Sequence, residues 1–344
     1  GPLTVEGNFT ADGGTIKLDG NYPTGTGNVA LGDTALDSGS LSGSSNTALG
    51  SGALTANTTG SNTAVGRNAL FNNTTGSTNT GIGQQALTTN TTGSSNTALG
   101  RDSLLSNTTA SENVAVGYQA GYSTTTGGAN TSVGVKALYL NTTAVANTAL
   151  GWNAAYSNTT GASNVAIGYQ SLASNTTASN NVAVGYQAGY SFTTGGYSTV
   201  MGYQAAQNAT AGGTVAIGHS SAKNNTGAGI TAVGSNALVT NTSGTSSTGI
   251  GTNALNDNTT GGYNVALGRN ALYSNTTANN NTAVGYAALN LNTTGTQNVA
   301  LGQSAASSTT TGGQNTAVGT NALNSNTTAS NNTAVGYQAG YTNT

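Results

Sequence analysis

A short motif that returns about every 17 residues constrains the fold of this chain more than any other feature. The motif reads Asn-Thr-Ala-Val-Gly or a close variant, and nineteen copies of it occupy residues 28–344. The consensus of one copy is N-T-A-V-G-x-x-A-L-x-x-N-T-T-G-x-x, numbered below as repeat positions 1 to 17. Position 5 is Gly in every copy, and position 4 is always Val, Leu, Ile or Met. Such regularity indicates an architecture in which each copy forms one structural unit.

The length of the repeat favours a parallel β-solenoid. Two packed helices need about 33 residues or more per repeat, and Thr and Asn are poor helix formers. Seventeen residues fit one coil of two or three short strands joined by turns, and nineteen coils stacked at about 4.8 Å form a rod of roughly 90 Å. A short helical turn is the alternative for positions 6–11. The copies begin at residues 28, 46, 62, 79, 96, 113, 130, 147, 164, 181, 198, 214, 230, 247, 264, 281, 298, 315 and 332.

The domain organisation follows from where the periodicity holds. Residues 1–27 precede the first copy and are expected to form a lead-in or cap, because the end of a solenoid needs covering. Residues 28–344 form the repeat array. With only 4% charged residues and an excess of Asn, Thr, Gly, Ala and Ser, the composition alone is also typical of low-complexity disorder. The strict apolar periodicity and a net charge of only −2 favour a folded solenoid instead.

Alternation along the expected strand gives it two different faces. Positions 2 and 4 carry Thr or Val and a large aliphatic residue, and positions 1, 3 and 5 carry Asn, Ala and Gly on the opposite face. Leu at position 9 is a second core residue. Stacked Asn side chains at position 1 are expected to hydrogen-bond from coil to coil; the alternative is that each Asn satisfies only its own turn. Gly at position 5 indicates a positive φ or a close backbone approach.

The sequence predicts that three chains associate. One 17-residue coil buries few aliphatic groups compared with the entropy lost in ordering its backbone. We therefore expect a further partner surface, and the small residues at positions 1, 3 and 5 allow close approach of a second backbone. Three such faces around an axis would form a homotrimer. A monomeric solenoid with a filled interior is the alternative.

The motifs resemble those of trimeric surface fibres. Segments such as N-V-A-I-G at 164–168 resemble the repeats in the head of trimeric autotransporter adhesins, the YadA-like β-roll, although that family's repeat is shorter. The combination of N-T-A-V-G, A-L and N-T-T-G is similar to arrays in bacteriophage tail fibres, and residues 13–32 look like the lead-in to such arrays. The resemblance covers residues 28–344. It implies a left-handed parallel β-roll, a homotrimer, and a shaft or head located on a virion tail or a cell surface.

The chemistry-bearing residues argue against an enzyme. Catalysis needs a positioned acid, base, nucleophile or metal, and the chain has one histidine, His219, which we expect to be exposed and without a partner. Five of the eight acidic residues lie in the first 37 residues, so no carboxylate recurs with the repeat to bind calcium. The chain has no cysteine, only six basic residues and no apolar run of about 18 residues. We therefore predict no catalytic residue, cofactor or metal, and neither a nucleic-acid nor a membrane partner.

Aromatic residues supply the one candidate binding face. Twelve of the fifteen tyrosines occupy two repeat positions, which also accept polar residues and are therefore expected to face solvent or a groove. A lateral carbohydrate-binding face is one interpretation of position 6, and cross-coil stacking that stiffens the rod is the other. Position 6 carries Tyr118, Trp152, Tyr169, Tyr186, Tyr203, Tyr286 and Tyr337, and position 10 carries Phe71, Tyr122, Tyr139, Tyr156, Tyr190, Tyr273 and Tyr341.

From the sequence we predict a structural fibre or adhesin segment used in host attachment. Its expected partners are other copies of itself and a cell-surface glycan or other host receptor, with many copies adding avidity. A self-assembling extracellular filament and an ice-binding solenoid are the alternatives. The ice-binding interpretation is the weaker because the adjacent threonines of N-T-T lie in an expected turn and not on a strand. The same triplets match the N-glycosylation sequon, and we interpret them as turns.

Overall fold

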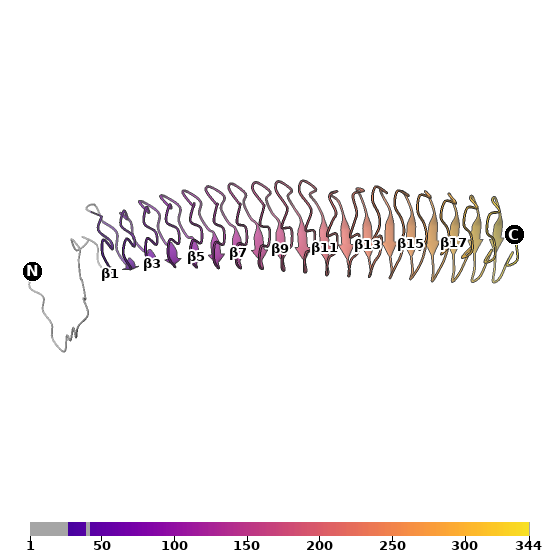
Figure 1. The fold of residues 1–344 in the computed structure, drawn as a ribbon, viewed down its shortest axis with the longest axis horizontal. Coiled ribbons are helices and arrows are strands. Elements are labelled where there is room, and N and C mark those ends of the chain that lie inside the picture. Colours follow the sequence, from indigo (N-terminus) through magenta and orange to yellow (C-terminus); the bar gives the residue numbers. More distant parts are fainter. Residues whose placement is uncertain (1–26, 39–41, 344) are drawn as a thin grey trace, which may run out of the picture.

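The computed structural model describes residues 27–38 and 42–343, which form a single parallel β-solenoid (Figure 1). The described residues contain no helix, and their one sheet has nineteen strands. The parallel solenoid predicted from the repeat is therefore confirmed, with about eighteen turns of about 17 residues each. The predicted lead-in at residues 1–27 lies outside the described residues except for Gly27.

Each coil contributes one strand of three residues, at repeat positions 2 to 4. The strands are Val29–Leu31 (β1), Thr47–Leu49 (β2), Thr63–Val65 (β3), Thr80–Ile82 (β4), Thr97–Leu99 (β5), Val114–Val116 (β6), Thr131–Val133 (β7), Thr148–Leu150 (β8), Val165–Ile167 (β9), Val182–Val184 (β10), Thr199–Met201 (β11), Val215–Ile217 (β12), Thr231–Val233 (β13), Thr248–Ile250 (β14), Val265–Leu267 (β15), Thr282–Val284 (β16), Val299–Leu301 (β17), Thr316–Val318 (β18) and Thr333–Val335 (β19).

Each strand pairs in parallel with the next along the chain, so equivalent repeat positions lie beside one another from β1 to β19. Backbone hydrogen bonds between coils continue beyond the strands. The amide of Gln170 donates to the carbonyl of Trp152 (2.9 Å), and the amide of Leu172 donates to the carbonyl of Ala188 (3.0 Å). Neighbouring coils are thus bonded at most points around their circumference, which favours a stiff rod.

Positions 6–11 form neither a second strand nor a helical turn. In this part of the coil, positions 7 and 9 both have a positive φ, as at Gln170 (53°) and Leu172 (49°). A leucine rarely adopts this left-handed region, but Leu172 is fully buried and its amide is bonded to the next coil. The expectation of two or three strands per coil was therefore wrong in the number of strands: one strand and a hydrogen-bonded series of turns close each coil.

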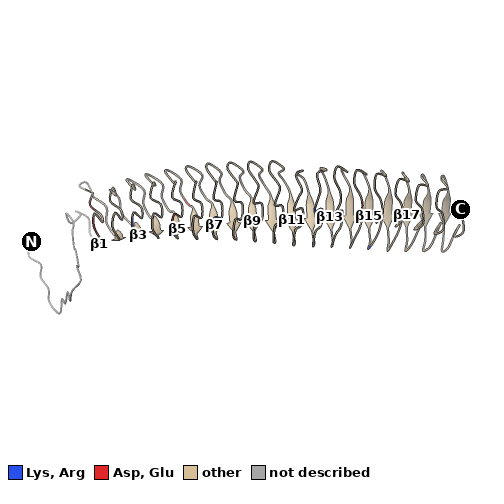
Figure 2. Ribbon diagram, in the orientation of Figure 1, with Lys and Arg blue, Asp and Glu red and all other residues tan. Residues whose placement is uncertain are grey.

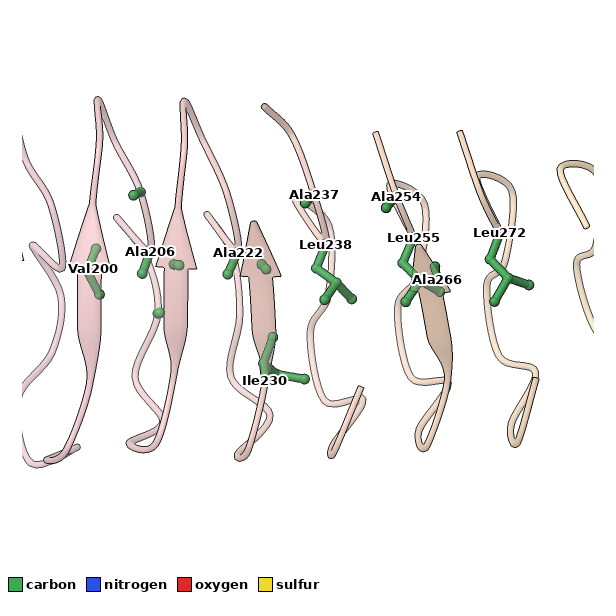
Figure 3. Packing of buried hydrophobic residues seen from close by; sticks show 14 of the residues in the cluster. Val200, Ala206, Ala222, Ile230, Ala237, Leu238, Ala254, Leu255, Ala266 and Leu272 are labelled. Atoms are coloured by element: carbon green, nitrogen blue, oxygen red, sulfur yellow. The ribbon is translucent and has the colours of Figure 1, made fainter. Parts of the chain in front are cut away.

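The small face of the strand points into the coil, opposite to the sequence expectation. Ala166 and Ala183 at position 3 are essentially inaccessible to solvent, as are Asn62 at position 1 and Leu172 at position 9. Figure 3 shows alanine and leucine side chains gathered inside the solenoid. The aliphatic residues of position 4 instead point outward, as Leu150 does with 45% of its surface exposed. The prediction that positions 1, 3 and 5 form a partner surface is therefore wrong, since positions 1 and 3 fill the chain's own interior and the Gly of position 5 lies against the backbone of the next coil.

The narrow interior explains why position 3 is small. A Cβ atom on Gly81, at position 3, would lie 3.3 Å from Cγ of Leu70, at position 9 of the preceding coil. The larger Val200 occupies position 3 where the preceding coil has Gly189 at position 9. Ser132 follows Gly121 in the same way, and a Cβ on Gly121 would lie 3.3 Å from Oγ of Ser132. Positions 9 and 3 of successive coils therefore share one packing volume.

Two asparagine ladders satisfy the polar groups of the interior. At position 1, Oδ1 of Asn164 accepts the backbone N–H of Asn181 (3.0 Å), and its Nδ2 donates to the carbonyl of Ala178 (2.8 Å) in its own coil. The predicted coil-to-coil bonding and the alternative of turn satisfaction therefore coexist in one side chain. The second ladder, at position 12, was not foreseen: Nδ2 of Asn175 donates to Oδ1 of Asn158 (2.7 Å).

Candidate functional surfaces

The aromatic residues of position 6 form a continuous stack of rings in the middle of the rod. Trp152 and Tyr169 have ring centroids 4.8 Å apart, and Tyr169, Tyr186 and Tyr203 follow at intervals of 5.1 Å. The planes of these neighbours differ by no more than 11°. The stack arises because equivalent positions of successive coils are separated by roughly the 4.8 Å spacing of paired strands, which is close to the preferred separation of stacked rings. The predicted cross-coil stacking is present.

His219 extends this stack at its C-terminal end. Its ring lies 5.4 Å from that of Tyr203, with 5° between the planes. The side chain is exposed, as predicted, but it is not isolated, because it occupies position 6 of its coil in line with the tyrosines. Repeat position, and not the local sequence, brings His219 to its partner.

The stack leaves ring edges exposed and covers most ring faces. Tyr186 has a neighbour on both sides and is still 40% exposed, because its edge and hydroxyl point to solvent. Sugar rings stack on the faces of aromatic side chains, so the inner rings offer a sugar only their edges. Tyr286 and Tyr337 are 50% and 73% exposed and stand apart from the stack, with Gln303 and Thr320 at position 6 of the coils between them. The carbohydrate role of these seven position-6 residues stays a prediction.

A second, shorter row of rings lies at position 10. Tyr122, Tyr139 and Tyr156 stack with centroids 5.0 and 5.1 Å apart. Burial raises the pKa of the Tyr139 phenol above its ordinary value of 10.0, and the phenols of Tyr122 and Tyr156 add to this shift. The ammonium of Lys136 lies 5.4 Å from the centre of the Tyr139 ring. This row therefore occupies the coils that begin at residues 113, 130 and 147, and it shares only the last of these, with Trp152 and Tyr156, with the position-6 stack.

An amide row at position 7 borders the position-6 stack. Nε2 of Gln187 donates to Oε1 of Gln170 (2.8 Å) in the preceding coil. The ammonium of Lys223, at position 10, donates to Oε1 of Gln204 (3.0 Å), which shows that position 10 lies beside position 7. Across this surface the order is thus aromatic, amide and aromatic, and hydrogen-bonding groups run alongside the rings.

Charged groups are sparse on the described surface (Figure 2). Arg101 and Asp102 form an ion pair with 3.3 Å between Nε and Oδ2, and the guanidinium of Arg101 lies 5.8 Å from the centre of the Tyr118 ring. Burial raises the pKa of the Asp257 carboxyl. Among residues 27–38 and 42–343, no three His, Cys, Asp or Glu side chains lie close enough to hold a metal ion. The same part of the chain contains no helix with the length and apolarity needed to cross a membrane.

The outer sheet face is a surface that the sequence reasoning assigned to the core. It consists of the outward side chains of positions 2 and 4 in β1 to β19, and every one of them is Thr, Val, Leu, Ile or Met. Leu99, Leu150 and Leu301 are each more than 40% exposed. Because the strands are in register, this uncharged face continues along the whole described array. The alternation of large and small residues distinguishes this face from the small face, but it carries no signal that tells which of the two faces outward.

The N-T-T triplets are turns, as predicted. In the triplet at 158–160, Nδ2 of Asn158 donates to the carbonyl of Gly161 (2.9 Å) and to Oδ1 of Asn141 (3.3 Å), and the asparagine is fully buried. Oγ1 of Thr159 donates to the carbonyl of Thr176 in the next coil (3.0 Å). The acceptor nitrogen of the sequon is therefore inaccessible in the folded coil.

Comparison with known proteins leaves the family unassigned. Neither the protein-family models nor the curated proteins include a match to this chain.

Proposed function

We propose that the chain is a structural rod of a host-attachment fibre, the shaft or head of a phage tail fibre or of a trimeric surface adhesin, and that it works outside the cell. The observation that carries this proposal is the outer sheet face. Monomeric soluble proteins rarely expose contiguous apolar patches larger than a few hundred Å². Here an aliphatic residue recurs at position 4 of every coil, and Leu99, Leu150 and Leu301 are each more than 40% exposed. Such a face supports lateral association of identical rods in register.

The proposed assembly is a parallel homotrimer that buries the three outer sheet faces around a common axis. In a parallel trimer in register, the three chains present the same coil at each level, so the three contacts around the axis are equivalent, as closed symmetry requires. Backbone bonding between coils makes the rod stiff. A stiff trimer can hold weak receptor contacts far from the particle and combine them into avidity. The proposal includes no catalytic step and no cofactor.

Light scattering after size exclusion tests the assembly. The chain has a mass of 33.4 kDa, and we expect a solution mass near three chains. Replacing Leu150 and Ile167 with Lys on the outer sheet face is expected to shift the mass toward one chain, because unpaired buried charges oppose association. The matched control replaces the exposed turn residues Thr143 and Thr160 with Lys and is expected to remain trimeric. A wild-type monomer would refute the trimer, and large open-ended polymers would favour a filament.

Ice binding is a second candidate, and one observation now favours it. Thr63, Thr80 and Thr97 at position 2 pair in register and point outward with the aliphatic residues of position 4. The sequence argument against ice binding considered only the adjacent threonines of N-T-T, which lie in turns, and not the strand threonines of position 2. A flat, uncharged face with regularly spaced hydroxyl and methyl groups could order water. Thermal hysteresis of the wild-type protein, lost when these threonines become Lys, would support this candidate, and no hysteresis would reject it.

A further inference from the structure

The position-6 stack is interrupted at one coil. The guanidinium of Arg101 covers one side of the Tyr118 ring, and the rings from Trp152 to His219 stack without a break. Between Tyr118 and Trp152 the coil carries Val135 instead of a ring. The three residues are in one row, because the amide of Lys136 donates to the carbonyl of Tyr118 (2.9 Å) and the amide of Asn153 donates to the carbonyl of Val135 (3.0 Å).

The interruption has the size of one missing ring. Successive rings in this stack are separated by about 5 Å, so Tyr118 and Trp152, two coils apart, are separated by roughly 10 Å when they follow the same spacing. A ring placed midway would lie about 5 Å from each, as the chain's own rings do. Val135 is short and 39% exposed, so it forms an apolar floor beneath this space. The face of Trp152 that looks away from Tyr169 borders the same space.

Polar groups suited to hydroxyls lie next to this space. The phenol of Tyr118 and the indole N–H of Trp152 belong to the two walls, and these side chains are 39% and 42% exposed. Oδ1 of Asn153 is buried, and the ammonium of Lys136 lies against the ring of Tyr139, so neither takes part. Binding sites typically combine apolar ring contacts with a few polar groups that fix orientation. An aromatic side chain of a partner protein would use the rings but leave these polar groups unused. A sugar ring uses both, since it has C–H groups on its faces and hydroxyls at its rim.

We propose that a single pyranose ring inserts between Tyr118 and Trp152, over Val135, and completes the stack. This inference rests on the proposed attachment function and names the ligand class. The chain's rings stack along the rod axis with their faces toward neighbouring coils. An inserted pyranose would therefore have its ring plane perpendicular to the rod axis. Its linkage would then point away from the surface. The site therefore selects a terminal or branch sugar of a glycan and not the interior of a polymer lying along the rod.

Trp152 is the single tryptophan of the chain, so its fluorescence reports directly on the site. The probes are the methyl glycosides of glucose, galactose, mannose, N-acetylglucosamine and glucuronic acid. We expect a saturable change in Trp152 fluorescence with at least one of them. No saturable change with any of the five would overturn the proposal, as would a change with N-acetyltyrosinamide alone. A trimer with no sugar response would refute this site while leaving the attachment rod intact.

Val135→Tyr is the decisive variant, because it fills the space with the chain's own ring. Position 6 carries tyrosine in six other coils, so the variant is expected to fold and to retain or raise the melting temperature. The sugar response should disappear. Ser235→Tyr, which adds a ring at position 6 beyond His219, is the matched control and should keep it. An undiminished response in Val135→Tyr would place the sugar elsewhere and overturn the proposal.

Tyr118→Ser tests the opposite wall without depending on a filled space. Ser51 and Ser235 show that position 6 accepts serine, and Trp152 remains as the reporter. Removing one of two stacking faces should weaken glycoside binding by about tenfold. An unchanged affinity would exclude Tyr118 from the site and with it the sandwich geometry.

Discussion

At the scale of single residues, the invariant Gly of position 5 combines a positive φ with a close approach to the backbone of the next coil, and no glycine at another repeat position in the described residues has both. Gly168 has a φ of 127°, and a Cβ on it would lie 2.5 Å from the carbonyl oxygen of Gly185 in the next coil. The left-handed conformation alone costs a residue with a side chain about 1–3 kcal/mol. The close contact adds to that, since the neighbour is backbone and belongs to the same stacked row.

We therefore predict that Gly168→Ala destabilises the rod by at least about 3 kcal/mol, measured as a fall in the melting temperature. Gly213→Ala is the control for a positive φ without a close backbone contact. Gly213 also has a positive φ (68°), but the nearest atom to an added Cβ is 3.9 Å away. This control should cost about 1 kcal/mol. Equal losses in the two variants would show that conformation, and not the approach of the coils, explains the invariant glycine.

At the scale of the coil, substitutions are compensated between positions that share a packing volume. In the coil that begins at Asn181, the consensus Leu of position 9 is Gly189 and the consensus Asn of position 12 is the fully buried Phe192. A Cβ on Gly189 would lie 2.8 Å from Cδ2 of Phe192. Oδ1 of Asn175 has no hydrogen-bond partner, because Phe192 interrupts the ladder above it.

The compensation predicts non-additive stabilities in this coil. Gly189→Leu should cost about 1–3 kcal/mol by overpacking, and Phe192→Asn about 3–5 kcal/mol by leaving a cavity. All four proteins carry Val200→Ala, because a Leu at position 9 requires a small residue at position 3 of the next coil. In that background the double variant restores the consensus residues and gives Asn175 a donor. It should be more stable than Phe192→Asn alone, with a coupling of about 1 kcal/mol or more. Thermal unfolding of the four proteins measures the coupling, and additive losses would contradict shared packing.

The coil scale also shows what the sequence can and cannot predict. The 17-residue period and the alternation of position 2 to 4 were enough to predict stacked parallel strands and the Asn row that includes Asn164. Alternation separates two faces without saying which one is inside. The answer depends on the width of the interior opposite the strand, where Leu70 and its equivalents already fill the space. The turns at positions 6–11 set this width. Their positive φ values, as at Leu172, have only a weak signal in the repeat, because Gly appears at position 9 in a few copies, such as Gly121 and Gly189, while most copies carry Leu or Ala there.

For the candidate surfaces, too, the sequence predicts which residues share a side of the rod but not how their side chains are arranged. Repeat spacing predicted that the position-6 tyrosines share one side of the rod, because equivalent positions stack. It could not show that the rings of Tyr169 and Tyr186 stack face to face, because this depends on their side-chain rotamers. The interruption at Val135 became meaningful only with the coil-to-coil register of Tyr118 and Trp152.

At the scale of the whole molecule, each coil contacts only its two neighbours, so the rod should behave as a linear array whose length is adjustable. Long-range contacts in the sheet join consecutive strands only. In such arrays stability is approximately a sum of unit and interface terms. The coil at 281–297 is uncharged and carries both interior asparagines, Asn281 and Asn292, bonded to neighbouring coils.

We predict that duplicating residues 281–297 in tandem lengthens the rod by about 4.8 Å without lowering its melting temperature. The inserted coil continues both ladders and the outer sheet face, so the association state should also be unchanged. Duplicating only residues 281–289 is the matched control. The inserted half-coil aligns position 1 of the second copy with position 10 of the preceding coil, so it interrupts both asparagine ladders and shifts the small face out of register. Small-angle X-ray scattering measures the length of the rod, and thermal unfolding measures its melting temperature. If the half-coil insertion were as stable as the full one, coil-to-coil register would not be what holds this solenoid together.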